Sequence, residues 1–216
     1  MEWSLLAGLP AEDVRQLLAI ARRRTFAKGE VVFHRDDPAD SLHLVMRGRF
    51  GARVLTPLGD SVLVDVVGPG QSFGELALLG PDGRRSATVE ALEAGETRSV
   101  LRDEFSSLQR AHPGVKDVLL RLLAEQLRRS TERVVEAHYV DAETRVRRRL
   151  VELAATYQGG VVPLTQEDIA AMAGTSRATV NRVLREEARH GAVALARGRT
   201  TVLDVDDLER RCRRRA

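Results

Sequence analysis

The chain has 216 residues, of which 43% are hydrophobic, and its formal net charge is +3. This composition suits one or two globular domains with apolar cores, and no apolar run reaches the roughly 18 residues that a membrane span needs. Cys212 is the only cysteine, which excludes an intramolecular disulfide, a cysteine-based zinc site and a cysteine-ligated iron–sulfur cluster within one chain. With no signal-peptide pattern at the N-terminus, we expect a cytoplasmic protein with no membrane partner.

The first part of the chain predicts a short helix followed by many short strands. Apolar residues between positions 11 and 24 recur at helical spacing, and Pro10 stands at the start of this pattern. We expect this helix, together with Trp3, to cap the strands that follow. From Thr25 to about Leu101, β-rich runs alternate with turns rich in Gly, Pro and Asp, which predicts an antiparallel sandwich or jelly roll.

One segment of this β-rich region combines a carboxylate with a cation across a tight turn. Glu75 follows Gly74, and the turn at 80–83 precedes Arg85 and Ser86. If the turn reverses the chain, a one-turn helix after Gly74 exposes amide groups to an anion, and Arg85 and Ser86 can bind a phosphate there. Glu75 can accept a hydrogen bond from a ribose hydroxyl, so the set describes a nucleotide site. A surface Glu–Arg ion pair explains the same residues equally well.

A long helix is predicted after Pro113, because no Pro or Gly interrupts the chain from 115 to 158. Within it, one set of positions steps by 3 and 4 residues, as in a coiled coil. This heptad stripe consists of Leu120, Leu123, Leu127, Ser130, Val134 and Ala137. We interpret the stripe as a dimer contact, although a core-facing stripe has the same spacing. Its polar step at Ser130, with Thr131 beside it, is typical of a position that sets register or contacts a ligand.

The last third of the chain predicts a basic winged helix. Residues 141–216 contain 15 Arg and 11 acidic residues, whereas residues 1–140 contain 19 basic and 20 acidic residues, so the positive charge lies in the C-terminal part. Two short helical patterns separated by Gly174 are followed by two strand patterns around an Arg-Gly-Arg turn. A helix-turn-helix followed by a β-hairpin is a winged helix.

The second of these helices has the residues expected of a DNA reader. Arg177 and Arg182 point outward near its start, where a helix-turn-helix enters the major groove, and arginine can donate two parallel hydrogen bonds to guanine. Four further residues are candidates for contacts to DNA through their hydroxyl groups, an amide side chain or the backbone amides at the start of a helix. They are Thr165, Ser176, Thr179 and Asn181. The alternative is a solvated arginine face on a small helical domain.

At this point the sequence resembles the cyclic AMP receptor protein/FNR family of bacterial transcription regulators. The resemblance covers nearly the whole chain, from "FAKGEVVFHRDDPADSLHLVMRGR" through "GQSFGELALLGPDGRRSATVEA" to "LTQEDIAAMAGTSRATVNRVL". Gly74-Glu75-Leu76 and Arg85-Ser86-Ala87 are similar to the cyclic-nucleotide form of the family's phosphate-binding segment. The resemblance implies that Glu75 binds the ribose 2′-hydroxyl and that Arg85 and Ser86 bind the cyclic phosphate.

The same resemblance implies roles for further residues and partners. Ser130 would contact the adenine in its own subunit and Thr131 the adenine in the partner subunit, although this chain reverses the usual order of the two hydroxyl residues. Ala178 stands where the family usually has a glutamate that accepts from cytosine, so we expect an altered half-site. The implied effector is cyclic AMP, and the implied partners are a second copy of the chain, a pseudo-palindromic double-stranded operator and RNA polymerase.

The expected fold class is α+β with three parts. Residues 1–112 form an antiparallel jelly-roll domain that binds cyclic nucleotide, residues 113–140 a long dimerisation helix and hinge, and residues 141–216 a winged helix-turn-helix domain. We expect no catalytic residues and no metal site. The alternatives kept open are a ligand-independent regulator of the same family, a haem-based or redox sensor, and a nucleotide-binding regulatory subunit of another protein.

Overall fold

The computed structural model describes residues 3–57, 59, 61–79 and 83–213. Residues 80–82 of the predicted tight turn lie outside this range. The chain divides into two compact units, residues 1–128 and residues 129–216, and each unit is described by itself below.

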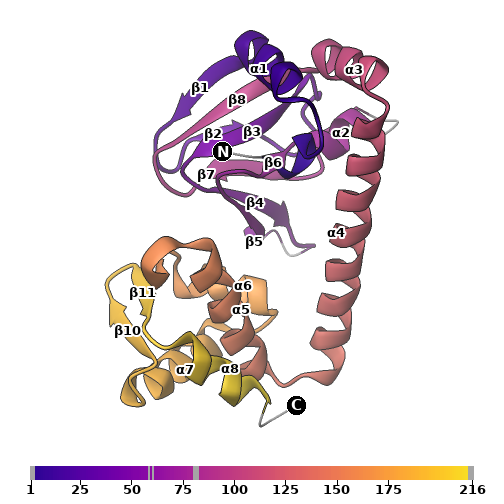
Figure 1. Ribbon diagram of the computed structural model, residues 1–216. Helices are drawn as coiled ribbons and strands as arrows, with labels where there is room; N and C mark the ends of the chain where they lie inside the picture. The colour runs from indigo at the N-terminus through magenta and orange to yellow at the C-terminus, as the bar shows by residue number, and fades with distance from the viewer. Residues whose placement is uncertain (1–2, 58, 60, 80–82, 214–216) are drawn as a thin grey trace. The chain divides into compact units, whose positions relative to one another are not determined.

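The N-terminal unit contains two four-stranded antiparallel sheets (Figure 1). The strands are β1 (Arg22–Phe26), β2 (Val31–Phe33), β3 (Ser41–Arg47), β4 (Phe50–Leu55), β5 (Ser61–Val67), β6 (Ser72–Phe73), β7 (Thr88–Ala91) and β8 (Gly95–Leu101). One sheet has the order β1-β8-β3-β6 and the other β2-β7-β4-β5. Neighbours in each sheet are mostly distant in sequence, as in a jelly roll, and the predicted antiparallel β architecture is confirmed.

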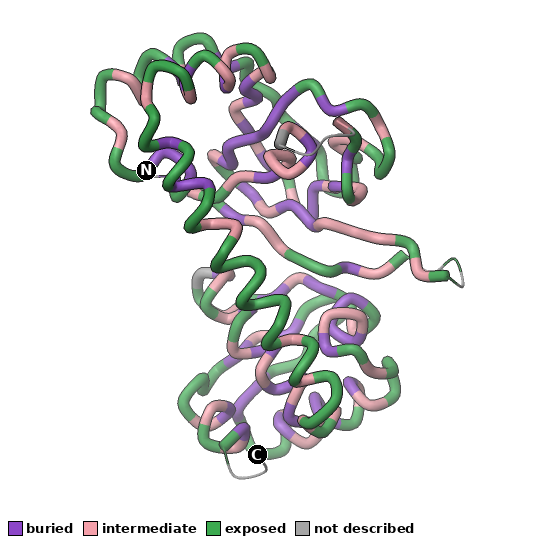
Figure 2. The backbone as a smooth tube through the Cα atoms, turned by 90° about the vertical axis from the view of Figure 1, so that its right-hand side faces the viewer, coloured by how far each residue is buried: buried purple, intermediate pink, exposed green. Residues whose placement is uncertain are grey.

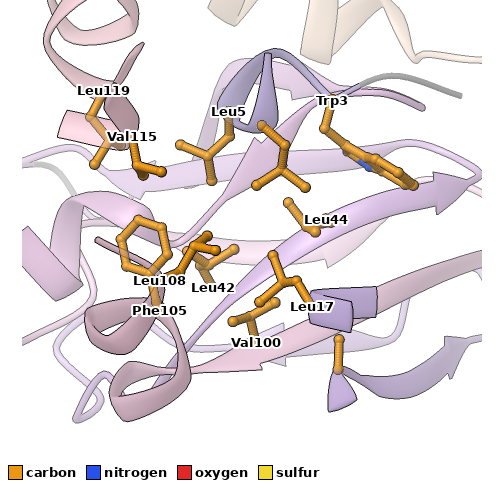
Figure 3. Packing of buried hydrophobic residues seen from close by; sticks show 12 residues of the cluster. Trp3, Leu5, Leu17, Leu42, Leu44, Val100, Phe105, Leu108, Val115 and Leu119 are labelled. Carbon is orange, nitrogen blue, oxygen red and sulfur yellow. The ribbon is translucent and has the colours of Figure 1, made fainter. Parts of the chain in front are cut away.

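Short helices cover the outer face of the first sheet. They are a single 3-10 turn (Ser4–Leu6), α1 (Ala11–Ile20) and α3 (Arg102–Ala111). Figure 3 shows their buried side chains meeting Leu42, Leu44 and Val100 from β3 and β8. Trp3 joins this cluster, and its indole Nε1 donates to the carbonyl of Val45 at 3.1 Å. The predicted cap formed by Trp3 and the early helix is therefore confirmed.

Aromatic residues fill the space between the two sheets. Phe26, Phe50 and Phe73 pack with Val45 and Val89 in a second buried cluster. The rings of Phe26 and Phe50 meet edge to face, with centroids 5.6 Å apart, which is a favoured arrangement for aromatic pairs. This cluster supports the candidate ligand segment, because Phe73, the last residue of β6, is directly followed by Gly74, where that segment begins.

The long helix α4 (Gly114–Tyr139) is buried only at its start. Val115 and Leu119 pack into the outer cluster of the N-terminal unit. Beyond Leu119 most of the helix is exposed (Figure 2). In the heptad stripe, Leu120, Leu127 and Val134 are exposed to 64%, 69% and 59%. These three residues are therefore an uncovered apolar surface of the single chain, which favours the interpretation as a contact surface over that as a core-facing stripe.

The C-terminal unit has the predicted winged helix. Its helices are α5 (Ala142–Thr156), α6 (Gln166–Ala173), α7 (Arg177–Arg189) and α8 (Val205–Arg213), and its strands are β9 (Val161–Val162), β10 (Val193–Ala196) and β11 (Arg199–Val202). A 3-10 turn spans Gln158–Gly160. The antiparallel hairpin β10–β11 is extended by β9 into a three-stranded sheet. Ile169, Val180, Val183 and Leu184 form the buried faces of α6 and α7.

The structure differs from the sequence-based expectations in a few elements. The first helix ends at Ile20, and residues 22–26, of which Arg22–Arg24 were read as helical, form strand β1 against β8. The pairing is supported by an ion pair between Arg23 and Glu96 at 2.7 Å. Helices α3 and α8 were not predicted. None of these differences moves the ligand segment or the helix-turn-helix.

Candidate functional site

The first candidate site is centred on the junction between β6 and α2 (Glu75–Leu79). Gly74 connects the two elements with a φ of +89°, a conformation that favours glycine. A Cβ atom at this position would lie 2.7 Å from Nη1 of Arg85 and 3.3 Å from the carbonyl oxygen of Ser41. Because Gly74 has no Cβ atom, the guanidinium of Arg85 can lie close to its backbone. The predicted approach of Arg85 to Gly74 is present in the structure.

Arg85 is 3% exposed and is held by backbone groups from two elements. Its Nη1 donates to the carbonyls of Ser41 at 2.6 Å and Gly74 at 3.3 Å. Its guanidinium lies 4.0 Å from the centroid of the Phe33 ring, a cation–π arrangement. Asp40, whose side chain is 79% exposed, lies 3.4 Å from Nη2. Arg85 is thus a buried cation with weak compensation by carboxylates, and burial lowers its pKa.

Two buried polar atoms in this segment lack a hydrogen-bond partner among the described residues. They are Nε of Arg85 and Oε2 of Glu75. Burial raises the pKa of Glu75, an effect opposed by the backbone amide of Glu75 itself and reinforced by the charge of Asp65. Buried polar groups are almost always hydrogen-bonded, and an exception requires an explanation such as a missing ligand. The segment therefore contains one donor, Nε of Arg85, and one acceptor, Oε2 of Glu75, that a ligand can satisfy.

A pocket of about 200 Å³ lies beside Arg85. Its polar lining includes Arg22, Arg24 and His43. His43 stacks on Phe73 with ring centroids 4.9 Å apart, and burial together with the charge of Arg85 lowers its pKa to about 3, so the ring is neutral at pH 7. Arg85 is the only predicted ligand residue that lines this pocket among the residues described.

The remaining predicted ligand residues have different surroundings. Leu76 is half-buried in α2, and Ser86 is exposed directly after Arg85. Ser130 and Thr131 are exposed on the outer part of α4. The structure therefore brings Gly74, Glu75 and Arg85 into one segment, and the nucleotide roles of the full set stay predictions. Phe33 and Ser41, which hold Arg85, were missed because nothing in their own strands marks them.

The second candidate site is the helix-turn-helix formed by α6 and α7. Thr165 caps α6 through a capping box with Asp168, and Ser176 caps α7 by accepting from the amide of Thr179 at 3.2 Å. Gly174 ends α6 in the left-handed conformation, which favours glycine. The predicted separation of the two helices by Gly174 is confirmed. The hydroxyl of Thr165 donates to Asp168 at 2.7 Å, so that group is already used within the helix start.

The exposed side of α7 carries the predicted reading residues. Arg177 and Ala178 are exposed, and the side chain of Arg177 forms no hydrogen bond or ion pair with any residue in the described part of the chain. Asn181 donates to Oε1 of Gln166 at 3.1 Å, which links α7 to α6. Arg182 forms an ion pair with Glu143 of α5. Both arginines are therefore exposed on α7, but they differ in how they are held.

Arginines of α5 hold the helix-turn-helix from behind. Arg145 donates through Nε to the carbonyl of Ala173 at 2.8 Å and through Nη2 to that of Gly174 at 2.9 Å. Arg147, which is 3% exposed at its side chain, donates to the buried Glu187 at 2.7 Å. The basic run at 145–150 is therefore mainly structural support in the C-terminal unit.

The wing adds further positive charge. Arg197 and Arg199 are exposed at the turn between β10 and β11, where Gly198 has a φ of +72°. Within the described ranges, no group of His, Cys, Asp and Glu side chains is suited to hold a metal ion. In the same ranges, no helix combines the length and the apolar character that crossing a bilayer requires.

Comparison with known proteins identifies two domains in the chain. Residues 23–112 match the cyclic nucleotide-binding domain, and residues 144–211 match the Crp-like helix-turn-helix domain. A protein with this pair of domains is a transcription regulator and not an enzyme.

Individual relatives extend the match over nearly the whole chain. The chain is 33% identical to a cyclic AMP receptor protein of Thermus thermophilus over 205 residues, covering 95% of this chain and 94% of the relative. It is 33% identical to a CRP-like cAMP-activated global transcriptional regulator of Mycobacterium tuberculosis, with 87% of each chain covered. The crystal structure of the Thermus thermophilus catabolite activator protein has a TM-score of 0.58 at 32% identity, covering 99% of this chain and 100% of that one.

FixK2 from Bradyrhizobium japonicum shares the fold with a TM-score of 0.76 at 21% identity, covering 88% of this chain and 96% of that one. The chain belongs to the CRP/FNR family of transcription regulators. It is a regulator with a cyclic nucleotide-binding domain and a DNA-binding helix-turn-helix domain.

Proposed function

We propose that the protein is a homodimeric transcription regulator whose affinity for operator DNA is controlled by cyclic AMP. The observation that carries this proposal is the pair of buried atoms without partners, Oε2 of Glu75 and Nε of Arg85. A cyclic nucleotide supplies both missing partners, because its ribose 2′-hydroxyl can donate to the carboxylate and its phosphate can accept from the guanidinium. The relative from Thermus thermophilus is named a cyclic AMP receptor protein, and the relative from Mycobacterium tuberculosis is named a cAMP-activated regulator.

The remaining ligand residues have complementary roles in this proposal. Ser86 donates to the cyclic phosphate, while Gly74 and Leu76 present backbone close to the sugar. Ser130 contacts the adenine in its own subunit and Thr131 the adenine of the partner. The carbonyls of Ser41 and Gly74 accept from Nη1 of Arg85, so Nε stays available to donate to the phosphate.

The open heptad stripe of α4 supports the proposed dimer. Leu120, Leu127 and Val134 are exposed in the single chain, and a second copy of the helix can cover them by knobs-into-holes packing. The dimer carries two recognition helices, which suits a pseudo-palindromic operator with half-sites about 34–36 Å apart. We propose RNA polymerase as the further partner of the DNA-bound dimer.

Reading of the operator is assigned to α7. Arg177 and Arg182 donate to guanine edges, and Thr165, Ser176, Thr179 and Asn181 position the unit on phosphates through side chains or helix-start amides. Ala178 can contact a thymine methyl group but cannot accept a hydrogen bond. The half-site therefore differs from that of family members that carry glutamate at this position.

The proposal is tested by calorimetry with cyclic AMP and cyclic GMP, followed by DNA selection with and without the tighter ligand. The nucleotide must bind the DNA-competent state more tightly, and operator DNA must tighten nucleotide binding by the same factor. The variant Arg85→Leu is expected to keep its fold and lose the nucleotide response. Unchanged cyclic AMP affinity in this variant refutes the role of Arg85, and DNA affinity indifferent to every nucleotide favours a ligand-independent regulator.

A further inference from the structure

The ion pair between Arg182 and Glu143 joins the recognition helix to the first turn of α5. Nη1 of Arg182 contacts Oε1 of Glu143. The side chain of Glu143 is 17% exposed, whereas that of Arg182 is 62% exposed. The carboxylate is thus mostly enclosed, and the guanidinium stays accessible from outside. The two residues are 39 positions apart, so the contact depends on the packing of the unit and not on local sequence.

Glu143 is itself held in place by its surroundings. It lies in the first turn of α5, where the helix dipole favours a negative charge, and Asp141 caps this helix by accepting from the amide of Thr144 at 2.9 Å. One turn further on, Nη1 of Arg147 lies 3.8 Å from Oε2 of Glu143. Arg147 is buried and fixed by Glu187. The carboxylate therefore sits between a rigid internal arginine and the exposed Arg182.

We propose that Glu143 is a positioning residue for base reading by Arg182, an inference that rests on the proposed DNA-reading role of Arg182. A guanidinium has five N–H donors in a planar fork. With Nη1 bound to Glu143, the edge formed by Nη2 and Nε stays available for two parallel hydrogen bonds to guanine O6 and N7. The ion pair restricts the rotamers of a long side chain before DNA binds, which reduces the ordering cost of the contact.

The geometry distinguishes this role from one in which Glu143 withholds Arg182 from DNA. A withheld guanidinium would be enclosed, but most of the Arg182 side chain is accessible to solvent. Arg177 at the start of the same helix provides a contrast, because its side chain has no bond to any residue that the structure describes. We therefore expect base discrimination by Arg182 to depend on Glu143, which orients its side chain before DNA binds. Base discrimination by Arg177 should not depend on Glu143.

The test compares Glu143→Gln with a matched control, Glu152→Gln, in the full-length protein with cyclic AMP. Glu152 lies on the same helix and pairs with Arg149 at 2.8 Å, so its substitution removes the same charge from another Arg–Glu pair of α5. The operator is first selected with the wild-type protein. Affinity is then measured for all four base pairs at the position where Arg182→Ala reduces discrimination.

Glu143→Gln is expected to lower discrimination for guanine at that position by about tenfold, equivalent to about 1.4 kcal/mol. Base discrimination at the Arg177 position and the thermal midpoint should be the same in Glu143→Gln and Glu152→Gln. If Glu143 were merely structural, its substitution would instead change these two quantities as well. If Arg182→Ala leaves discrimination intact at every position, the proposed reading role itself fails. If Arg182→Ala reduces discrimination but Glu143→Gln does not, or if Glu143→Gln tightens specific binding, only the positioning role is overturned.

Discussion

Nε of Arg147 donates to Oε1 of Glu187 at 2.7 Å, and the two side chains are only 3% and 0% exposed. This pair links α5 to the recognition helix α7 inside the C-terminal unit. Glu186 adds a second carboxylate 3.3 Å from Nη2 of the same arginine. The orientation of the reading face therefore depends on a buried ionic contact as well as on the apolar core.

Removing Glu187 should be destabilising, because the buried Arg147 loses its shortest carboxylate contact and keeps only the longer ones to Glu186 and Glu143. Glu187→Ala is expected to lower the free energy of unfolding by up to about 3–5 kcal/mol, measured by denaturation with hydrogen exchange at the α7 amides. The control is Glu209→Ala, which breaks the exposed pair with Arg213 and should cost less than about 1 kcal/mol. A similar small loss for both variants would show that the buried pair is not a stabilising contact.

The buried carboxyl group of Glu75 predicts a pH dependence of stability. Its pKa is raised by burial above the ordinary value of 4.5, so the folded chain binds a proton more tightly than the unfolded chain. The free energy of unfolding therefore falls as pH rises from 4.5 through the raised pKa. Glu75→Gln removes this loss of stability with rising pH. The free energy of unfolding of Glu75→Gln should therefore increase relative to that of the wild type as pH rises from 4.5 through the raised pKa, measured by denaturation curves at successive pH values.

Glu12 provides the opposite case for comparison, because hydrogen bonding by Arg15 lowers its pKa. Glu12→Gln should show no gain in stability as pH rises. Ionisation of Glu75 lowers stability but favours ligand binding, because a ribose hydroxyl donates best to the ionised carboxylate. Cyclic AMP affinity of the wild type should thus increase with pH over the same window, and a pH-independent affinity would argue against Glu75 as the acceptor.

The architecture was largely predictable because its signals are local. Alternating apolar residues and turn glycines mark the strands of the jelly roll, and capping residues such as Thr165 and Ser176 mark the ends of helices α6 and α7. Strand β1 was missed because Arg22, Arg23 and Arg24 continue the polar side of the preceding helix pattern. Their extended conformation is set by pairing with β8, a partner more than 70 residues away.

The candidate ligand segment could be located from the sequence, but the conformation of its central residue could not. The spacing of Glu75, Arg85 and Ser86 indicates an anion site. The contact of Arg85 with the carbonyl of Ser41 and its packing on Phe33 depend on tertiary structure alone. For the same reason Glu143 gave no signal as a partner of Arg182, because no local pattern relates two residues on separate helices.

The close approach of Gly74 and Arg85 predicts a specific effect of a single methyl group. In Gly74→Ala the new Cβ would meet Nη1 of Arg85 at 2.7 Å, so the guanidinium must move. We expect at least a tenfold loss of cyclic AMP affinity, about 1.4 kcal/mol, measured by calorimetry. The positive φ adds a stability cost of about 1–2 kcal/mol.

Gly29→Ala separates strain from contact, because Gly29 also has a positive φ, +81°, but nothing lies within 4 Å of its Cβ position. This variant should lose similar stability and keep its nucleotide affinity. Equal loss of affinity in both variants would mean that backbone strain, and not the displacement of Arg85, controls ligand binding.

The exposed heptad stripe predicts that one polar substitution on α4 separates the subunits. Leu127, 69% exposed in the single chain, occupies a core position of the proposed coiled coil, where glutamine removes apolar packing in both copies at once. Leu127→Gln should sediment as a monomer at concentrations where the wild type is a dimer, and it should bind a full operator no more tightly than a single half-site. Arg129→Gln changes an exposed residue off the stripe and should remain dimeric. A dimeric Leu127→Gln protein, or dissociation of both variants, would place the subunit contact elsewhere on the chain.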